Sequence, residues 1–154
     1  MGFLLVDEIL EVKRGGSIIA ATDFSALEEF CVDHIIYGRM VPPPLVAEAV
    51  AQAAGWLIMA SLDFKKRGLL VNLGQMEFNS VVRSADRLIL EAELLSLHED
   101  AAMLTGRAKV GGKVVGKVDS ALCVLVDADK LDDVGKTRSK FSELIRKPAE
   151  NLRV

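Results

Sequence analysis

The stretch from Val41 to Leu62 constrains this chain most, because Glu48 is its only charged residue. Three prolines open it, and proline is tolerated in the first turn of a helix but not later. The pattern therefore predicts one long helix from about Pro44 to Lys65. Its length is near the lower limit for crossing a membrane. However, Glu48 and Gln52 lie inside it and it is richer in Ala and Gly than in Leu and Ile, so we expect a buried helix of a globular protein with no membrane span.

The segments on both sides of this helix have the character of β-strands. Asp7 to Asp23 is typical of two strands around a turn at Gly15-Gly16. Leu27 to Met40 shows no sustained period and is expected to form a loop or short helical turns. Four strands are expected after Gly68: Leu69–Phe78, Arg87–Leu97, Ala102–Val110 and Lys113–Val126. Helix and strands are segregated along the chain, which predicts an α+β fold with a curved, mainly antiparallel sheet wrapped around one helix.

The domain organisation follows from length and from a change of composition. A chain of 154 residues suits one domain, and we place its core at residues 1–126. Residues 127–154 are charged and poor in large apolar side chains. Phe141, Leu144 and Ile145 have helical spacing, which predicts a short helix ending at Lys147-Pro148. We expect this C-terminal extension to be appended to the core rather than part of it.

Charge and cysteine content narrow the possible partners and compartment. The net charge is −3, whereas phosphate backbones are bound by clustered positive charge, so no nucleic-acid partner is expected. The two cysteines form no Cys-x-x-Cys pair, and the N-terminus has no basic segment before a long apolar run. We therefore expect a cytoplasmic protein with reduced thiols.

Two polar residues stand out as candidates for acid–base chemistry. Glu48 lies in an apolar helix, and burial would favour the neutral carboxyl group, which can donate a proton. His34 precedes the helix by a loop long enough to fold back over the helix N-terminus, and histidine is the usual proton acceptor near neutral pH. On the residues alone, the alternative stays open that Glu48 is satisfied by a partner and that His34 is an ordinary loop histidine.

The surrounding sequence resembles a known family. The run Glu28 to His34 is followed by Pro42 and then by Glu48-Ala49-Val50-Ala51-Gln52-Ala53-Ala54-Gly55. Together these segments resemble the FabZ/FabA-type 3-hydroxyacyl-acyl-carrier-protein dehydratases, which carry a histidine and a carboxylate at the same separation as His34 and Glu48. The likeness extends over about the first 126 residues.

The resemblance implies a hotdog fold in which the long helix is wrapped by the sheet. It also implies a homodimer, with a trimer of such dimers as an open alternative, and active sites that take His34 from one subunit and Glu48 from the other. The substrate would be a 3-hydroxyacyl thioester of acyl carrier protein or CoA, and the product a trans-2-enoyl thioester. No metal and no redox cofactor is implied, because the substrate itself carries the phosphopantetheine arm.

The further candidates for substrate binding are Tyr37, Pro43, Leu45, Gln52, Met76, Phe78 and Val81. Pro43 stands where the family has a glycine whose amide binds the thioester carbonyl, and proline has no amide hydrogen. Leu45 and later amides, or Tyr37, are left to replace that donor. Gln52 is one turn after Glu48 and is expected to hold its carboxylate, whereas Met76, Phe78 and Val81 are expected along an acyl tunnel.

Two other functions stay open at this point. Hotdog folds also support thioesterases, in which a carboxylate of this helix would activate water, although this rests on fold analogy alone. The second alternative is a non-catalytic protein that binds acyl chains or carrier proteins, and the loss of the amide at Pro43 favours it.

Overall fold

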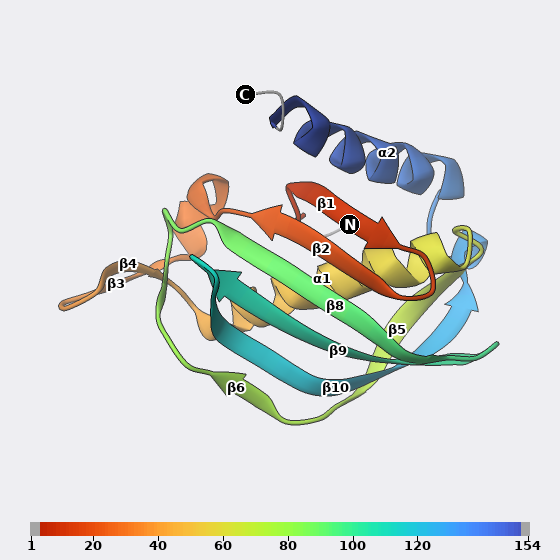
Figure 1. Cartoon of the computed structure of the whole chain (residues 1–154), viewed down its shortest axis with the longest axis horizontal. Helices are drawn as coiled ribbons and strands as arrows, with labels where there is room; N and C mark the ends of the chain where they lie inside the picture. The colour runs from red at the N-terminus through yellow and green to blue at the C-terminus, as the bar shows by residue number, and fades with distance from the viewer. Residues whose placement is uncertain (1–3, 152–154) are drawn as a thin grey trace.

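The computed structural model describes residues 4–151, which form one curved sheet around a central helix (Figure 1). The main sheet has the order β1-β2-β8-β9-β10-β5, and β6 also pairs with β10. Every pairing in it is antiparallel. Its strands are β1 (Glu8–Lys13), β2 (Ser17–Thr22), β5 (Lys66–Leu73), β6 (Met76–Phe78), β8 (Leu88–Leu97), β9 (Ala101–Val110) and β10 (Lys113–Asp127). The expected α+β fold is confirmed, and within the main sheet β1 and β2 precede the long helix and the other strands follow it.

The helix α1 (Pro43–Ser61) packs against the inner face of the sheet. The alternating pattern correctly predicted strand β8, because its apolar residues Leu88, Leu90 and Ala92 are buried on that face. Two glycines allow the helix to come close: a Cβ atom at Gly68 would lie 2.8 Å from Ile58 Cδ1, and one at Gly106 would lie 2.6 Å from Val50 Cγ1. By length and composition α1 could cross a membrane, but half of its most apolar window is buried inside the fold.

The C-terminal end of α1 differs from the prediction. The helix stops at Ser61 rather than continuing to Lys65, and Gly68 lies inside β5. Asp63 and Phe64 adopt positive φ angles of 52° and 60°, which are unfavourable for side chains other than glycine. The amide of Phe64 donates to the carbonyl oxygen of Met59 at 2.7 Å, and the Phe64 side chain is buried. Burial of this ring therefore outweighs the local backbone preference.

The segment expected to form a loop or short helical turns contains one such turn and, in addition, a hairpin that was not expected. A 3₁₀ helix, η1 (Ser25–Phe30), leads into a hairpin of β3 (Val32–His34) and β4 (Gly38–Val41). Strand β4 also pairs with β7 (Val82–Arg83) to make a small second sheet. The hairpin is too short to show a repeating pattern in the sequence, and Figure 1 shows it projecting from the body of the molecule.

The C-terminal extension is also more ordered than expected. After η2 (Ala128–Lys130), helix α2 (Val134–Asn151) continues through Pro148 rather than ending there. Figure 1 shows α2 lying across the outer edge of the sheet beside β1. Phe141 and Leu144 are buried and belong to the hydrophobic core, so α2 is packed into the fold and not simply appended to it.

Candidate active site

An apolar groove of about 1140 Å³ runs along α1, between the helix and one end of the main sheet. Its floor is the helix, where Ala47, Ala51 and Gly55 follow one another at intervals of one turn. Its walls come from β5, β6, β9 and β10. The small side chains of α1 keep this space open, which gives the alanine-rich composition of the helix a structural reason.

A second pocket of about 700 Å³ lies at the N-terminal end of α1. Its lining is more polar and includes Tyr37, Asn79 and Arg83. Pro43 and Phe78 line both this pocket and the apolar groove. The two spaces therefore adjoin at the beginning of the helix, so that a long molecule with a polar part and an apolar part would fit across them.

Glu48 lines the apolar groove and is held there by a short chain of hydrogen bonds. The amide of Leu5 donates to Gln52 Oε1 at 2.8 Å. This bond orients the side-chain amide of Gln52, whose Nε2 then donates to Glu48 Oε1 at 3.3 Å. The Glu48 side chain is exposed in the single chain rather than buried as the sequence suggested, although it lines the groove.

His34 lies apart from Glu48, at the end of β3 in the projecting hairpin, and it lines neither pocket. Its Nδ1 accepts hydrogen bonds from the amides of Ile36 at 3.1 Å and Tyr37 at 3.4 Å. The Tyr37 ring lies 4.9 Å from the imidazole, centroid to centroid. Since Nδ1 accepts, a neutral ring in this arrangement carries its hydrogen on Nε2.

The first turn of α1 offers no amide hydrogen to a ligand. Pro43 and Pro44 have none, and the amides of Leu45 and Val46 both donate to the carbonyl oxygen of Pro42, at 2.9 and 3.4 Å. The amide of Leu45, expected from the sequence to face the substrate, is therefore already used within the helix. Tyr37, the other candidate named from the sequence for that role, lines the same pocket as Pro43.

The remaining predicted residues are divided between the two spaces. Met76 lines the apolar groove, Phe78 lines both spaces, and Val81 lines the polar pocket. Leu45 lines neither and packs against the core. Cys123 of β10 is buried and also lines the groove, and burial raises the pKa of its thiol.

Sequence reasoning missed the contribution of α2 to this site. Lys136, Thr137 and Lys140 line the groove at the end away from Pro43, near Trp56 of α1. The only signal in the sequence was the helical spacing of Phe141 and Leu144, which predicts a helix but not where it packs. In the described part of the chain, no three or more His, Cys, Asp or Glu side chains are grouped as metal ligands would be.

An antiparallel sheet curved around one helix, with an open groove along that helix, defines a hotdog-fold protein. Solved structures share this architecture: a protein from Streptococcus mutans bound to acetyl CoA has a TM-score of 0.62 at 11% identity and covers 78% of this chain and 88% of its own. A hypothetical thioesterase from Streptococcus pneumoniae, solved with coenzyme A, has a TM-score of 0.59 at 15% identity, with the same coverage of 78% and 88%. Similarity at this level establishes the fold.

Sequence comparison defines the family. The family model of the FabA-like domain matches residues 1–119. A 3-hydroxyacyl-[acyl-carrier-protein] dehydratase FabZ from Thermoanaerobacter sp. is 35% identical over 118 residues, which cover 76% of this chain and 83% of that protein. The FabZ of Enterococcus faecalis is 33% identical over 118 residues, with coverage of 76% and 84%. The chain therefore belongs to the FabA-like family, as the motif around His34 and Glu48 indicated.

Proposed function

We propose that this protein dehydrates 3-hydroxyacyl thioesters to trans-2-enoyl thioesters. The observation that carries the proposal is the position of Glu48, held by Gln52 in the groove beside the point where groove and polar pocket adjoin. An acyl chain in the groove and a phosphopantetheine arm in the polar pocket would bring the reacting carbons to this carboxyl group. The names of the curated relatives support the same reaction.

The chemistry divides between two residues. His34 takes the proton from C2 of the substrate, and the electron pair of that C–H bond forms the C2–C3 double bond. The C3–O bond breaks, and the hydroxyl group leaves as water with the proton that Glu48 donates. For His34 to accept a proton through Nε2, Nδ1 must release the amides of Ile36 and Tyr37 and carry the hydrogen itself.

We further propose that the working unit is a homodimer with His34 and Glu48 contributed by different subunits. Three features support this: His34 lies on a projecting hairpin, it shares no pocket with Glu48 in the described chain, and Ile35 and Ile36 beside it are exposed. Strand β5 ends the main sheet and exposes Leu69, Leu70 and Val71. An exposed apolar edge strand is a natural site for pairing with another chain.

The rest of the proposal concerns the thioester and its carrier. Tyr37 would replace the missing helix amide as the donor to the thioester carbonyl, because it lines the polar pocket next to Pro43. The substrate would be carried by acyl carrier protein or CoA, with no metal or redox cofactor, in the cytoplasm. This follows the family assignment, in which the phosphopantetheine arm belongs to the substrate.

The thioesterase alternative also has a specific observation in its favour. Glu48 is exposed and lines the groove, so its carboxylate is accessible to a water molecule that would attack the thioester carbonyl. The neighbour from Streptococcus pneumoniae is named a hypothetical thioesterase. Hydrolysis would release a free thiol, whereas dehydration leaves the thioester intact.

Two assays on the same protein separate these functions. Purified protein is incubated with 3-hydroxyacyl-CoA, and both enoyl-thioester absorbance and free thiol are followed. We expect enoyl product without thiol, and a loss of about 10²–10⁴-fold in rate for His34→Ala and for Glu48→Gln. Release of thiol without enoyl product would show that the protein is a thioesterase and not a dehydratase. If neither product forms at any chain length, the non-catalytic binding protein is the remaining alternative.

Mixing the two inactive variants tests the shared site. After subunit exchange, a His34→Ala/Glu48→Gln heterodimer would contain one intact site, so activity should return to about one quarter of the wild-type value for random pairing of two-fold dimers. No recovery, with exchange verified by a mass tag, would mean that both residues act within one subunit.

A further inference from the structure

The start of α2 closes the apolar groove at the end opposite the proposed reaction. Met59 and Trp56, near the end of α1, line this part of the groove together with Lys136, Thr137 and Lys140 of α2. The match to the FabA-like domain ends at residue 119, whereas α2 begins at Val134. The end wall is therefore built by a segment outside the shared family domain.

The wall is fixed in place by contacts on both sides of the helix. Arg138 donates to Asp63 Oδ1 at 3.1 Å and to the Asp63 carbonyl oxygen at 2.7 Å. The ring of Phe141 lies 5.9 Å from that of Trp56 and 5.2 Å from that of Phe64, measured between centroids. These contacts hold the first turns of α2 against the end of α1, so the wall is part of the packed structure.

The chemical character of the groove changes where α2 begins. Between Ala47 and Met59 the helix presents mostly apolar side chains, but beyond Met59 the lining becomes charged, with an ion pair between Arg67 and Asp132 and with Lys140 of α2. An alkyl chain that continued past this point would remove charged groups from water without replacing their hydrogen bonds, which is unfavourable. The wall therefore opposes a long chain by charge as well as by volume.

The length of the groove sets an approximate limit. From Glu48 to Met59 the helix advances about 16 Å at 1.5 Å per residue. An extended chain advances about 1.2 Å per bond, judged from the backbone's 3.3–3.6 Å per three bonds. The groove would then hold roughly 13 carbons beyond the carbon at Glu48 before the chain meets α2.

We infer that the first turns of α2 determine the acyl chain length that this protein accepts, with Thr137 and Lys140 as the specificity-determining side chains. The inference rests on the proposed function, because it takes an acyl chain as the occupant of the groove. It adds a substrate class to that function: thioesters with chains up to about the length of the groove, and discrimination against longer ones.

Binding of saturated acyl-CoA thioesters tests the inference without requiring turnover. The series runs from about eight to about twenty carbons, which brackets the groove length. Trp56 is the only tryptophan of the chain and lines the far part of the groove, so its fluorescence reports when a chain arrives there. In the wild type we expect affinity to rise about fourfold per added methylene until the chain reaches α2 and then to stop rising.

The key variant is Thr137→Phe, with Ser139→Phe as its matched control. Thr137 lines the groove, whereas Ser139 is an exposed residue of α2 outside the lining. We expect Thr137→Phe to weaken binding of the longest chains by about tenfold or more, as loss of two buried methylenes would, and to leave the shortest chains unchanged. Lys140→Ala should act in the opposite direction and move the plateau to longer chains.

The outcomes are distinct. Equal profiles for the wild type and all three variants, or equal weakening at every length by Thr137→Phe, would overturn the inference. If Thr137→Phe does not fold, the Lys140→Ala variant tests the inference by itself: the affinity plateau must move to longer chains, and a plateau that stays in place or moves to shorter chains would overturn the inference. A length profile that moves as expected in a protein without enoyl formation would support the inference and reject the proposed dehydration, so the two failures can be told apart.

Discussion

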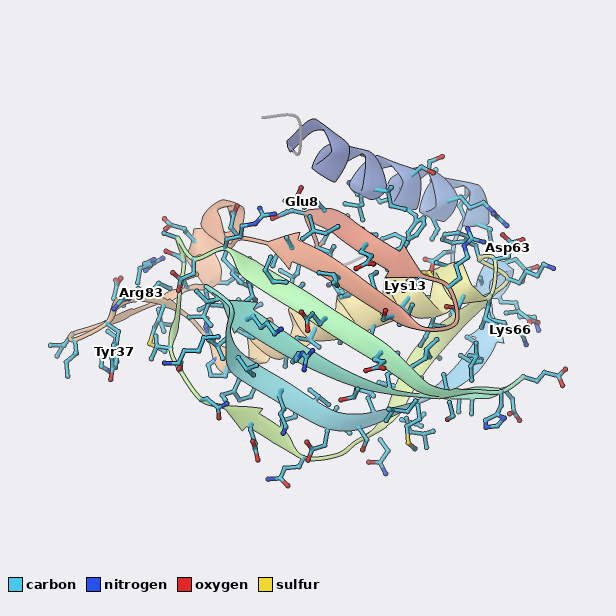
Figure 2. All side chains as sticks on the ribbon, viewed as in Figure 1. Glu8, Lys13, Tyr37, Asp63, Lys66 and Arg83 are labelled. Atoms are coloured by element: carbon cyan, nitrogen blue, oxygen red, sulfur yellow. The ribbon has the colours of Figure 1, made fainter. Side chains whose placement is uncertain are left out.

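The two ends of α1 are built in opposite ways. At its N-terminal end the helix has no side-chain cap, begins with prolines, and opens into two adjoining pockets beside Glu48. At its C-terminal end, Trp56 and Phe64 are buried against Phe141 of α2. Figure 2 shows the contrast in space, with Tyr37 on the projecting hairpin and Asp63 at the opposite end of the molecule, under the start of α2.

The C-terminal end of α1 contributes to the stability of the fold, whereas the N-terminal end leaves space for a ligand. A side chain that contacts other buried side chains stabilises the fold through the apolar area it removes from water. A carboxylate facing an open groove contributes little to stability but is accessible to a substrate. We therefore expect substitutions at the C-terminal end of α1 to change folding, and substitutions at the N-terminal end to change activity.

The largest expected effect on stability comes from Phe141→Ala. The ring is buried between Trp56 and Phe64, and truncation of a buried aromatic residue costs about 3–5 kcal/mol in the free energy of unfolding. Urea denaturation of the wild type and the variant measures this. Ile145→Ala is the matched control, because Ile145 is exposed on the same helix, and it should cost about 1 kcal/mol or less. Equal losses in the two variants would mean that packing of Phe141 against Trp56 and Phe64 stabilises the fold no more than an exposed side chain of α2 does.

At the open end, Pro43→Gly should raise the rate without a comparable change in stability. The substitution restores an amide hydrogen in the first helical turn, where the described structure offers none to a ligand. A single donor to a developing oxyanion is worth about 10²–10³-fold in rate, and we expect a gain of about tenfold because Tyr37 would already fill part of that role.

Steady-state kinetics on a 3-hydroxyacyl-CoA measure kcat for Pro43→Gly, with Pro44→Ala as the control, since Pro44 also lies in the first turn. The control should leave kcat within about twofold, because no role in binding the carbonyl is assigned to that position. An unchanged kcat in Pro43→Gly would show that the carbonyl is bound away from the helix N-terminus.

The smallest expected effect is the acid sensitivity of the covered end. The hydrogen bond from Arg138, helped by its positive charge, lowers the pKa of Asp63 from its ordinary value. A group with a lowered folded-state pKa stabilises the fold above its unfolded pKa of about 4 and loses that contribution as the pH falls through the folded pKa. The pair is exposed, so solvent screening keeps the effect small.

Asp63→Asn removes this titration and keeps a residue type that tolerates a positive φ angle. We expect the wild type to lose about one degree more in Tm than the variant between neutral pH and pH of about 3. Glu143→Gln, at the exposed pair with Lys140, serves as the control and should retain the wild-type dependence. An identical pH dependence in Asp63→Asn and the wild type would show that the Arg138 contact does not contribute.

Much of the fold could be predicted from the sequence because it is encoded in short-range periodicity. The alternation of Leu88, Leu90 and Ala92 identifies the face of β8 that meets the helix, and the prolines define the helix start to within one residue. The family assignment was also accessible, since the motif around His34 and Glu48 consists of residues close together in the chain.

The tertiary structure decided what depends on contacts between distant segments. The exposure of Glu48, the use of the Leu45 amide by Pro42, and the contribution of Thr137 to the groove have no periodic signature. The periodic spacing of apolar residues shows which face of a helix or strand is apolar, but it does not show which other element covers that face. The sequence alone therefore determined the helix, the strands of the main sheet and the candidate residues, whereas packing decided that one end of α1 stays open and that α2 closes the other.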